Sequence, residues 1–177
     1  MLKQANDLKL IDKPSNIKEV IKLSETIKNK IQLDKSFEIT KFRYLRDIFI
    51  VGLPRSGSTL VESIIGMNNE VHNLGENGIL RNALIESEKS DFLNLDEIYF
   101  NYSKDFSSRK YTTNKMLSNY MYIPHILSKL EHSKVIYTFR NPLDNVLSMY
   151  RAKFTGLGNE YSSSLRDSAH YYMYQFR

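Results

Sequence analysis

A short loop of small residues between an apolar run and a helical pattern constrains the fold of this 177-residue chain more than any other feature. Residues 47–51 form an apolar run that is typical of a buried parallel strand, and Gly52 ends it. The letters GLPRSGST follow at residues 52–59, and apolar side chains then recur at helical spacing to residue 65. A strand, a glycine-bearing loop and a helix in this order are typical of phosphate-binding loops.

The loop contains the residue types that hold an anion. Small residues allow backbone N–H groups to curl around the anion, and the N-terminus of the next helix adds partial positive charge. The spacing from Gly52 to Gly57 is that of a Walker A loop, but Ser58 stands where that loop has its lysine. Because this lysine reaches the β- and γ-phosphates, its absence argues against ATP or GTP hydrolysis. Arg55 instead supplies a guanidinium, which suits paired contacts with phosphate or sulfate oxygens.

A second apolar run and several helical patterns indicate the fold class. Residues 134–139 are interpreted as another buried strand, and Pro142 is expected to begin a helix that reaches about Lys153. Strands that alternate with helices predict an α/β fold, with a P-loop-type parallel sheet flanked by helices. Residues 1–14 are expected to be partly helical. Further helices are expected near residues 15–31, 76–88, 94–102, 118–130 and 161–177, with a kink at Pro124 in the fourth of them.

The end of the chain suggests an incomplete domain. Two strands are evident, whereas sheets of this kind usually have about four or five. The sequence stops at Arg177 within a helical pattern that no glycine caps. We therefore expect a domain that is truncated at its C-terminus.

Composition excludes several classes of protein. The chain has no cysteine, which excludes disulfide scaffolds, thiolate-zinc sites and cysteine nucleophiles. No stretch approaches the ~18 apolar residues of a membrane span, and charged residues interrupt the N-terminal region where a secretion signal would be apolar. We therefore expect a cytoplasmic protein. Residues 1–47 hold eleven Lys or Arg against seven Asp or Glu, but the mixed signs and few aromatic residues favour a solvated helix over a nucleic-acid surface.

Residues 49–60 resemble the 5′-phosphosulfate loop of the sulfotransferases, in particular the branch of tyrosylprotein sulfotransferases and bacterial tetratricopeptide-linked sulfotransferases. That family transfers a sulfuryl group from 3′-phosphoadenosine 5′-phosphosulfate (PAPS) to a hydroxyl or amine. The resemblance extends over about residues 47–177 and implies the sulfotransferase fold, with PAPS as donor and no metal. The donor-binding residues that it implies in this loop are Arg55, Ser56, Gly57, Ser58 and Thr59.

Two further segments that match the family carry the implied chemistry. In VHNLGE, residues 71–76, the Gly-Glu pair of the family implies that Glu76 is the catalytic base, and a carboxylate can accept the proton that the attacking acceptor loses. His72 is a rival base by residue type, and we interpret it as a structural or surface histidine. In TNKM, residues 113–116, the resemblance implies that Lys115 stabilises the charge that builds on the bridging oxygen in the transition state.

A third segment, VIYTFRNPLDNVLS at residues 135–148, concerns the other end of the donor. The family binds the 3′-phosphate with an arginine at this strand end and a serine eight residues later, which implies Arg140 and Ser148. The aromatic residues in 167–172 also resemble the bacterial branch, and we interpret them as packing. Gly78 stands where animal tyrosylprotein sulfotransferases have an arginine, so peptide tyrosine is one expected acceptor beside carbohydrates and small molecules.

The resemblance divides the chain into two parts. Residues 1–46 are interpreted as an N-terminal helical segment and linker, and residues 47–177 as the N-terminal part of a sulfotransferase catalytic domain. The expected partners are PAPS, its product adenosine 3′,5′-bisphosphate (PAP) and a hydroxyl-bearing acceptor that receives the sulfuryl group by in-line transfer, with no nucleic acid and no membrane span. Two alternatives stay open: a P-loop nucleotide-binding kinase or NTPase, and a catalytically incomplete PAPS-binding fragment.

Overall fold

The computed structural model describes residues 1–29, 46–89, 95–104, 106, 109–152, 154 and 158–176. These residues form two compact units. The described residues within 46–52 and 58–138 make up what we call the sheet unit, and those within 1–29, 53–57 and 139–176 make up what we call the helical unit. Within the described ranges, the structure contains no helix with the length and apolar character needed to cross a bilayer.

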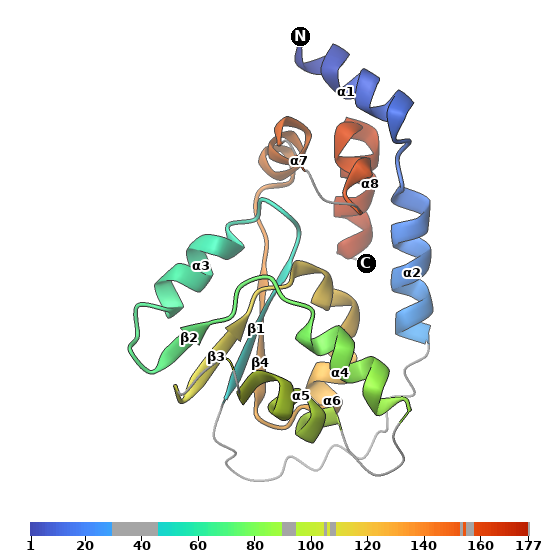
Figure 1. The fold of residues 1–177 in the computed structure, drawn as a ribbon. Coiled ribbons are helices and arrows are strands. Elements are labelled where there is room, and N and C mark those ends of the chain that lie inside the picture. Colours follow the sequence, from blue (N-terminus) through green and yellow to red (C-terminus); the bar gives the residue numbers. More distant parts are fainter. Residues whose placement is uncertain are drawn as a thin grey trace. The chain divides into compact units, whose positions relative to one another are not determined.

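The sheet unit is built on a four-stranded parallel sheet with the strand order β2-β3-β1-β4 (Figure 1). The strands are β1 (Asp47–Gly52), β2 (Val71–Asn73), β3 (Tyr111–Asn114) and β4 (Ser133–Thr138). β1 lies inside the sheet, with Asp47 paired to Thr112 of β3 on one side and to Ser133 of β4 on the other. Since helical segments connect these parallel strands, the predicted α/β fold is confirmed.

The sequence shows only two of the four strands, because β2 and β3 lack the apolar runs that identify a buried strand. β2 has three residues and β3 has four, and β3 is largely polar. Thr112, Thr113 and Asn114 of β3 are nevertheless buried. Their side chains bond to groups far away in the sequence, as in the hydrogen bond that Thr112 Oγ1 donates to Asp47 Oδ1 at 2.7 Å. Tertiary hydrogen bonds therefore compensate the burial of polar groups in this strand.

β1 forms the centre of the core because its side chains are apolar and fully covered. Phe49, Ile50 and Val51 have no exposed surface. Gly52 ends the strand with a φ of 137°, and a Cβ there would overlap the carbonyl oxygen of Thr138 at the end of β4. Only glycine fits this position, because the two strands run close together up to their carboxyl ends.

The helical segments of the sheet unit differ from the sequence prediction at two places. The segments are α3 (Ser58–Ile65), α4 (Ile79–Ser87), α5 (Leu95–Lys104), the 3₁₀ helix η1 (Leu117–Tyr122) and α6 (Ile123–Lys129). α4 starts after Glu76, because Asn77 Oδ1 accepts a hydrogen bond from the N–H of Ile79 and forms a turn. The helix predicted at 118–130 is a 3₁₀ turn followed by α6. Pro124 lies in the first turn of α6, where no N–H partner is required, so the expected kink is wrong.

The helical unit contains α1 (Leu2–Asp12), α2 (Ile17–Asn29), α7 (Pro142–Arg151), the 3₁₀ helix η2 (Glu160–Ser163) and α8 (Leu165–Gln175). The predicted start of α7 at Pro142 is confirmed, and Asn141 caps it by accepting hydrogen bonds from the backbone N–H groups of Leu143 and Asp144. The helix predicted at 161–177 is divided by Ser164, whose side chain caps α8. Parts of several predicted segments lie outside the described residues, namely residues 30–45, 94, 153 and 177.

The N-terminal helices pack on the C-terminal part of the chain within the helical unit. Asn6 of α1 is buried and donates from Nδ2 to the backbone oxygen of Tyr150 at 3.0 Å. The backbone N–H of Tyr161 donates to Asn16 Oδ1 at 3.0 Å. Long-range bonds of this kind give residues 1–29 a defined place in this unit.

His125 of α6 is expected to make the stability of the chain depend on pH. Burial lowers the pKa of its imidazole below the ordinary value of 6.5, and Lys129 acts in the same direction while Glu88 opposes it. The folded state therefore favours neutral His125. Its stabilising contribution is present above pH 6.5 and is lost as the pH falls through that value toward the lower folded pKa.

The free energy of unfolding should thus decrease as the pH falls below 6.5, and His125→Gln should flatten this part of the pH profile. Urea titrations at several pH values measure both slopes. The same slope in the two proteins would contradict the assignment to His125.

Candidate functional site

The loop at residues 53–57 has an unusual backbone that α7 holds in place. Arg55 has a φ of 67° and Gly57 a φ of 95°. Glycine adopts such values freely, whereas a non-glycine residue there carries about 1–3 kcal/mol of strain, which is typical of ligand-binding loops. Asn145 of α7 is fully buried and donates from Nδ2 to the backbone oxygen of Pro54 at 3.1 Å. This bond fixes the loop immediately before Arg55.

Three arginines line one cavity of about 380 Å³ in the helical unit. The residues of this cavity, which we call the arginine pocket, are Arg55, Arg140, Asp144, Leu147, Ser148, Arg151 and Ala152. Arg55 Nε donates to Ser148 Oγ at 3.2 Å. The structure thus brings together Arg55, predicted for the 5′ end of the donor, with Arg140 and Ser148, predicted for the 3′-phosphate. Three guanidinium groups against one carboxylate make the pocket strongly suited to anions.

The backbone of Arg140 is held while its side chain remains weakly paired. Tyr172 of α8 donates from its hydroxyl to the Arg140 carbonyl oxygen at 2.8 Å, so this tyrosine does more than the predicted packing. Asp144 Oδ2 lies 3.9 Å from Arg140 Nη2, and the two side chains are 62% and 50% exposed. Such exposed pairs contribute little, so the Arg140 guanidinium can turn toward a ligand at small cost.

Sequence reasoning missed two residues of this part of the molecule. Arg151 follows Ser148 by three residues on α7 and lines the same pocket. Asn145 precedes Ser148 by three residues and holds the loop. Residues three apart share a helix face, so a projection of residues 142–151 on a helix would have placed both beside Ser148.

The sheet unit brings the predicted base and the predicted transition-state cation together. Lys115 Nζ donates to Glu76 Oε1 at 2.6 Å. The Lys115 side chain is 8% exposed and that of Glu76 is 61% exposed. A buried lysine normally needs an ionic partner, and Glu76 supplies it. The arrangement combines a fixed ammonium with a carboxylate that reaches solvent.

The parallel pairing of β2 with β3 explains why these two side chains meet. Glu76 follows β2 and Lys115 follows β3, and the carboxyl ends of adjacent parallel strands lie at the same edge of a sheet. The backbone continues the pairing beyond the strands, since the N–H of Lys115 donates to the carbonyl oxygen of Gly75 at 2.9 Å. Gly75 has a φ of 63°, which turns the chain directly before Glu76.

The remaining predicted residues lie in both units. Ser56 and Gly57 belong to the loop of the helical unit, while Ser58 and Thr59 form the first turn of α3 in the sheet unit. Ser58 is buried and Thr59 is exposed. The rival base His72 lies in β2 and is half-buried.

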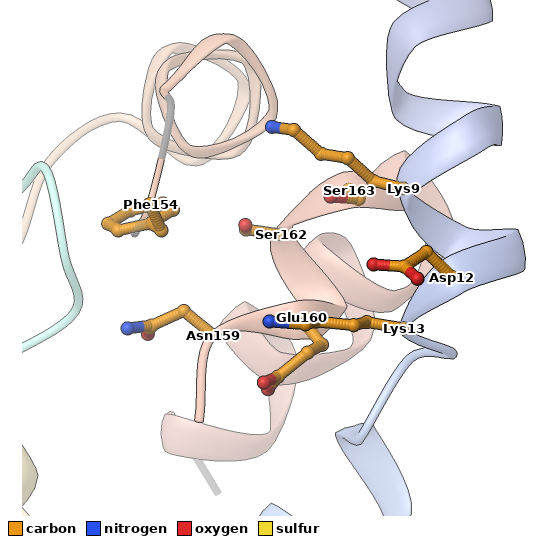
Figure 2. A pocket seen from close by; sticks show the side chains of 8 residues that line it. All are labelled: Lys9, Asp12, Lys13, Phe154, Asn159, Glu160, Ser162 and Ser163. Carbon is orange, nitrogen blue, oxygen red and sulfur yellow. The ribbon is translucent and has the colours of Figure 1, made fainter. Parts of the chain in front are cut away.

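A second cavity of the helical unit, of about 190 Å³, lies beside α1 and η2 (Figure 2). Lys9, Asp12, Lys13 and Glu160 all line it, so that its charges are balanced. This cavity therefore has no preference for one sign of ligand charge, whereas the arginine pocket favours anions. No group of three or more acidic or histidine side chains suited to a metal ion occurs within the part of the chain that the structure describes.

Comparisons with known proteins place these features in a family. Residues 45–169 match the family model described as "Sulfotransferase domain". This segment includes the loop, the Glu76–Lys115 pair and the arginine pocket. A relative from Aquifex aeolicus (strain VF5), which bears the name "Uncharacterized protein", is 28% identical over 131 residues. The match covers 62% of this chain and 17% of the relative, so the chain spans about a sixth of that protein's length.

Proposed function

Because this chain belongs to the sulfotransferase domain family, we propose that it moves a sulfuryl group from PAPS to a hydroxyl group of an acceptor. The predicted family is confirmed by the match over residues 45–169. The observation that supports the proposal most is the arginine pocket, in which a loop arginine and a strand-end arginine meet beside one serine. Such a pocket suits a donor that carries several anionic groups.

Donor binding is assigned to the loop and the arginine pocket. Arg140 and Ser148 would hold the 3′-phosphate, since a guanidinium and a hydroxyl can both donate to its oxygens. The loop residues Arg55, Ser56 and Gly57, with Ser58 and Thr59 at the start of α3, would hold the 5′-phosphosulfate. We add Arg151 to the donor-binding residues, because it lines the same pocket.

The chemistry is assigned to the Glu76–Lys115 pair. The acceptor oxygen attacks the donor sulfur in line with the leaving group, Glu76 takes the acceptor proton, and the bond between sulfur and the 5′-phosphate oxygen breaks. The released PAP carries new negative charge on that oxygen, which Lys115 would stabilise. Protonation removes the negative charge of Glu76 and weakens its ion pair with Lys115. The Lys115 ammonium can then interact with the oxygen of the leaving group. Positive charge of the kind that magnesium provides in kinases would come from Lys115 in the sheet unit, and from Arg55 and loop N–H groups in the helical unit.

Three finer parts of the proposal rest on the sequence. The letters of residues 49–60 support the branch of tyrosylprotein and bacterial tetratricopeptide-linked sulfotransferases. The acceptor is proposed to be a hydroxyl of peptide tyrosine, a carbohydrate or a small molecule. The chain is proposed to divide into an N-terminal segment, residues 1–46, and a part of a catalytic domain, residues 47–177. The start of the family match at residue 45 supports this division.

Binding of PAP to the full chain tests the proposed function. Calorimetry should show tighter binding of PAP than of AMP or ATP, because only PAP places a phosphate at Arg140. Arg140→Ala should weaken PAP binding by about 10- to 100-fold and barely change AMP binding.

Arg166→Ala is the matched control, since Arg166 is an exposed arginine of α8 that does not line the arginine pocket. Equal losses of PAP and AMP affinity in Arg140→Ala would show that Arg140 has only a structural role. Tighter binding of ATP with magnesium than of PAP would favour a kinase or NTPase.

A further inference from the structure

We infer that Glu62, a buried carboxylate on α3, is a positioning residue that holds Glu76 and Lys115 in their reactive arrangement. The inference deepens the proposed function and rests on it for the roles of these two residues. Glu62 lies outside the segments that the sequence singled out for chemistry. It is 7% exposed and belongs to the helix that begins directly after the loop.

One oxygen of Glu62 binds both segments that carry the reactive pair. Its Oε1 accepts a hydrogen bond from the backbone N–H of Gly75 at 3.1 Å and from Thr113 Oγ1 at 2.7 Å. Gly75 directly precedes Glu76, and Thr113 lies two residues before Lys115. The carboxylate therefore ties the end of β2 to the end of β3 at the level of the base and the ammonium.

A backbone hydrogen bond also joins the two segments of the reactive pair. The carbonyl oxygen of Gly75 accepts from the N–H of Lys115 at 2.9 Å. The Gly75 residue is thus held through its N–H by Glu62 and through its C=O by Lys115. A residue in the left-handed region between two such bonds has little freedom, so the direction in which Glu76 leaves the backbone is set.

Because Glu62 is buried, its environment favours a positioning role over a direct catalytic role. Its Oε1 already accepts two hydrogen bonds within the sheet unit, whereas the Glu76 side chain is 61% exposed. An apolar residue at position 62 would leave the Gly75 N–H without the acceptor that Glu62 supplies, which is costly inside a protein. The Thr113 hydroxyl would keep only its longer contact with Asn73 Oδ1, at 3.2 Å. Glu62 also joins α3, whose first turn holds Ser58 and Thr59, to the segments of the reactive pair.

Two substitutions of Glu62 test this role in the full chain. Glu62→Gln keeps an acceptor oxygen and the shape of the side chain, so we expect kcat within about 3-fold of the wild type. Glu62→Met keeps the length but removes the acceptor. We expect it to lower kcat by about 10- to 100-fold, with the KM for PAPS within about 3-fold, because the reactive groups are displaced while the donor is still bound. Transfer from radiolabelled PAPS to a tyrosine peptide, a sugar or a phenol supplies the rates.

Amide hydrogen exchange provides a second readout that does not depend on catalysis. Exchange of the Gly75 N–H, followed by NMR, should be about 10- to 100-fold faster in Glu62→Met and close to the wild-type rate in Glu62→Gln. The charge-matched control is Glu70→Gln, which removes a carboxylate from an exposed position and should change neither readout. Unchanged exchange and unchanged kcat in Glu62→Met would overturn the inference.

The two readouts distinguish failure of this inference from failure of the proposed function. If the wild-type chain neither binds PAP nor transfers sulfate, the proposed function is wrong, and so is the reactive role that Glu62 would support. If Glu62→Met does not fold, Thr113→Val removes one donor to Glu62 instead and Thr113→Ser restores it. A lower kcat in Thr113→Val that Thr113→Ser restores would support the inference, and equal rates in both would overturn it.

Discussion

Replacement of Glu76 by glutamine is expected to remove most sulfuryl transfer and to leave PAP binding nearly intact. The amide keeps the shape of the side chain, and its oxygen can still accept the hydrogen bond from Lys115 Nζ. It cannot take up a proton at neutral pH, so the acceptor oxygen would attack without a base. Loss of a general base lowers the rate by about 10²- to 10⁴-fold. Turnover of radiolabelled PAPS measures the rate, and calorimetry with PAP measures binding.

His72→Gln is the control for this prediction, since His72 is the rival base. It should retain most of the wild-type rate. Equal rates in Glu76→Gln and the wild type would remove Glu76 as the base and would restore His72 as the candidate. The assays are run with EDTA, and a complete loss of wild-type activity under that condition would favour the kinase-like alternative.

Arg55→Ala is expected to weaken the binding of PAP and PAPS by about 10- to 100-fold. Arg55 contributes a guanidinium to a pocket that it shares with Arg140 and Arg151. A charge-assisted hydrogen bond to a phosphate contributes about 1.5 to 3 kcal/mol, which corresponds to this loss of affinity. Calorimetry with PAP measures the change, and an unchanged affinity would contradict the assignment.

A glycine at position 55 separates the side chain from the backbone. The φ of 67° at Arg55 strains a residue with a Cβ, and glycine adopts it without strain. If the guanidinium binds the donor, Arg55→Gly should lose as much affinity as Arg55→Ala. If Arg55→Gly bound PAP as the wild type does, the conformation of the loop would account for binding and the guanidinium would not.

The predictable parts of the fold are those with local patterns. The apolar residues of β1 indicate a buried strand, and the glycines and serines after it are typical of an anion-binding loop before a helix. Pro142 after Asn141 predicts the start of α7. β2 and β3 have no such pattern, because they are short and their polar side chains are satisfied by partners far away in the sequence.

The sequence by itself determined the α/β class, the position of the loop and the choice of candidate site residues. Tertiary structure decided which of them meet. Glu76 and Lys115 are 39 residues apart, and they form an ion pair because β2 and β3 run parallel and end at the same edge of the sheet. Arg55 and Ser148 are 93 residues apart and meet because α7 holds the loop through Asn145. Local patterns report periodicity and backbone preference, whereas contacts between distant residues depend on the register and packing of the whole unit.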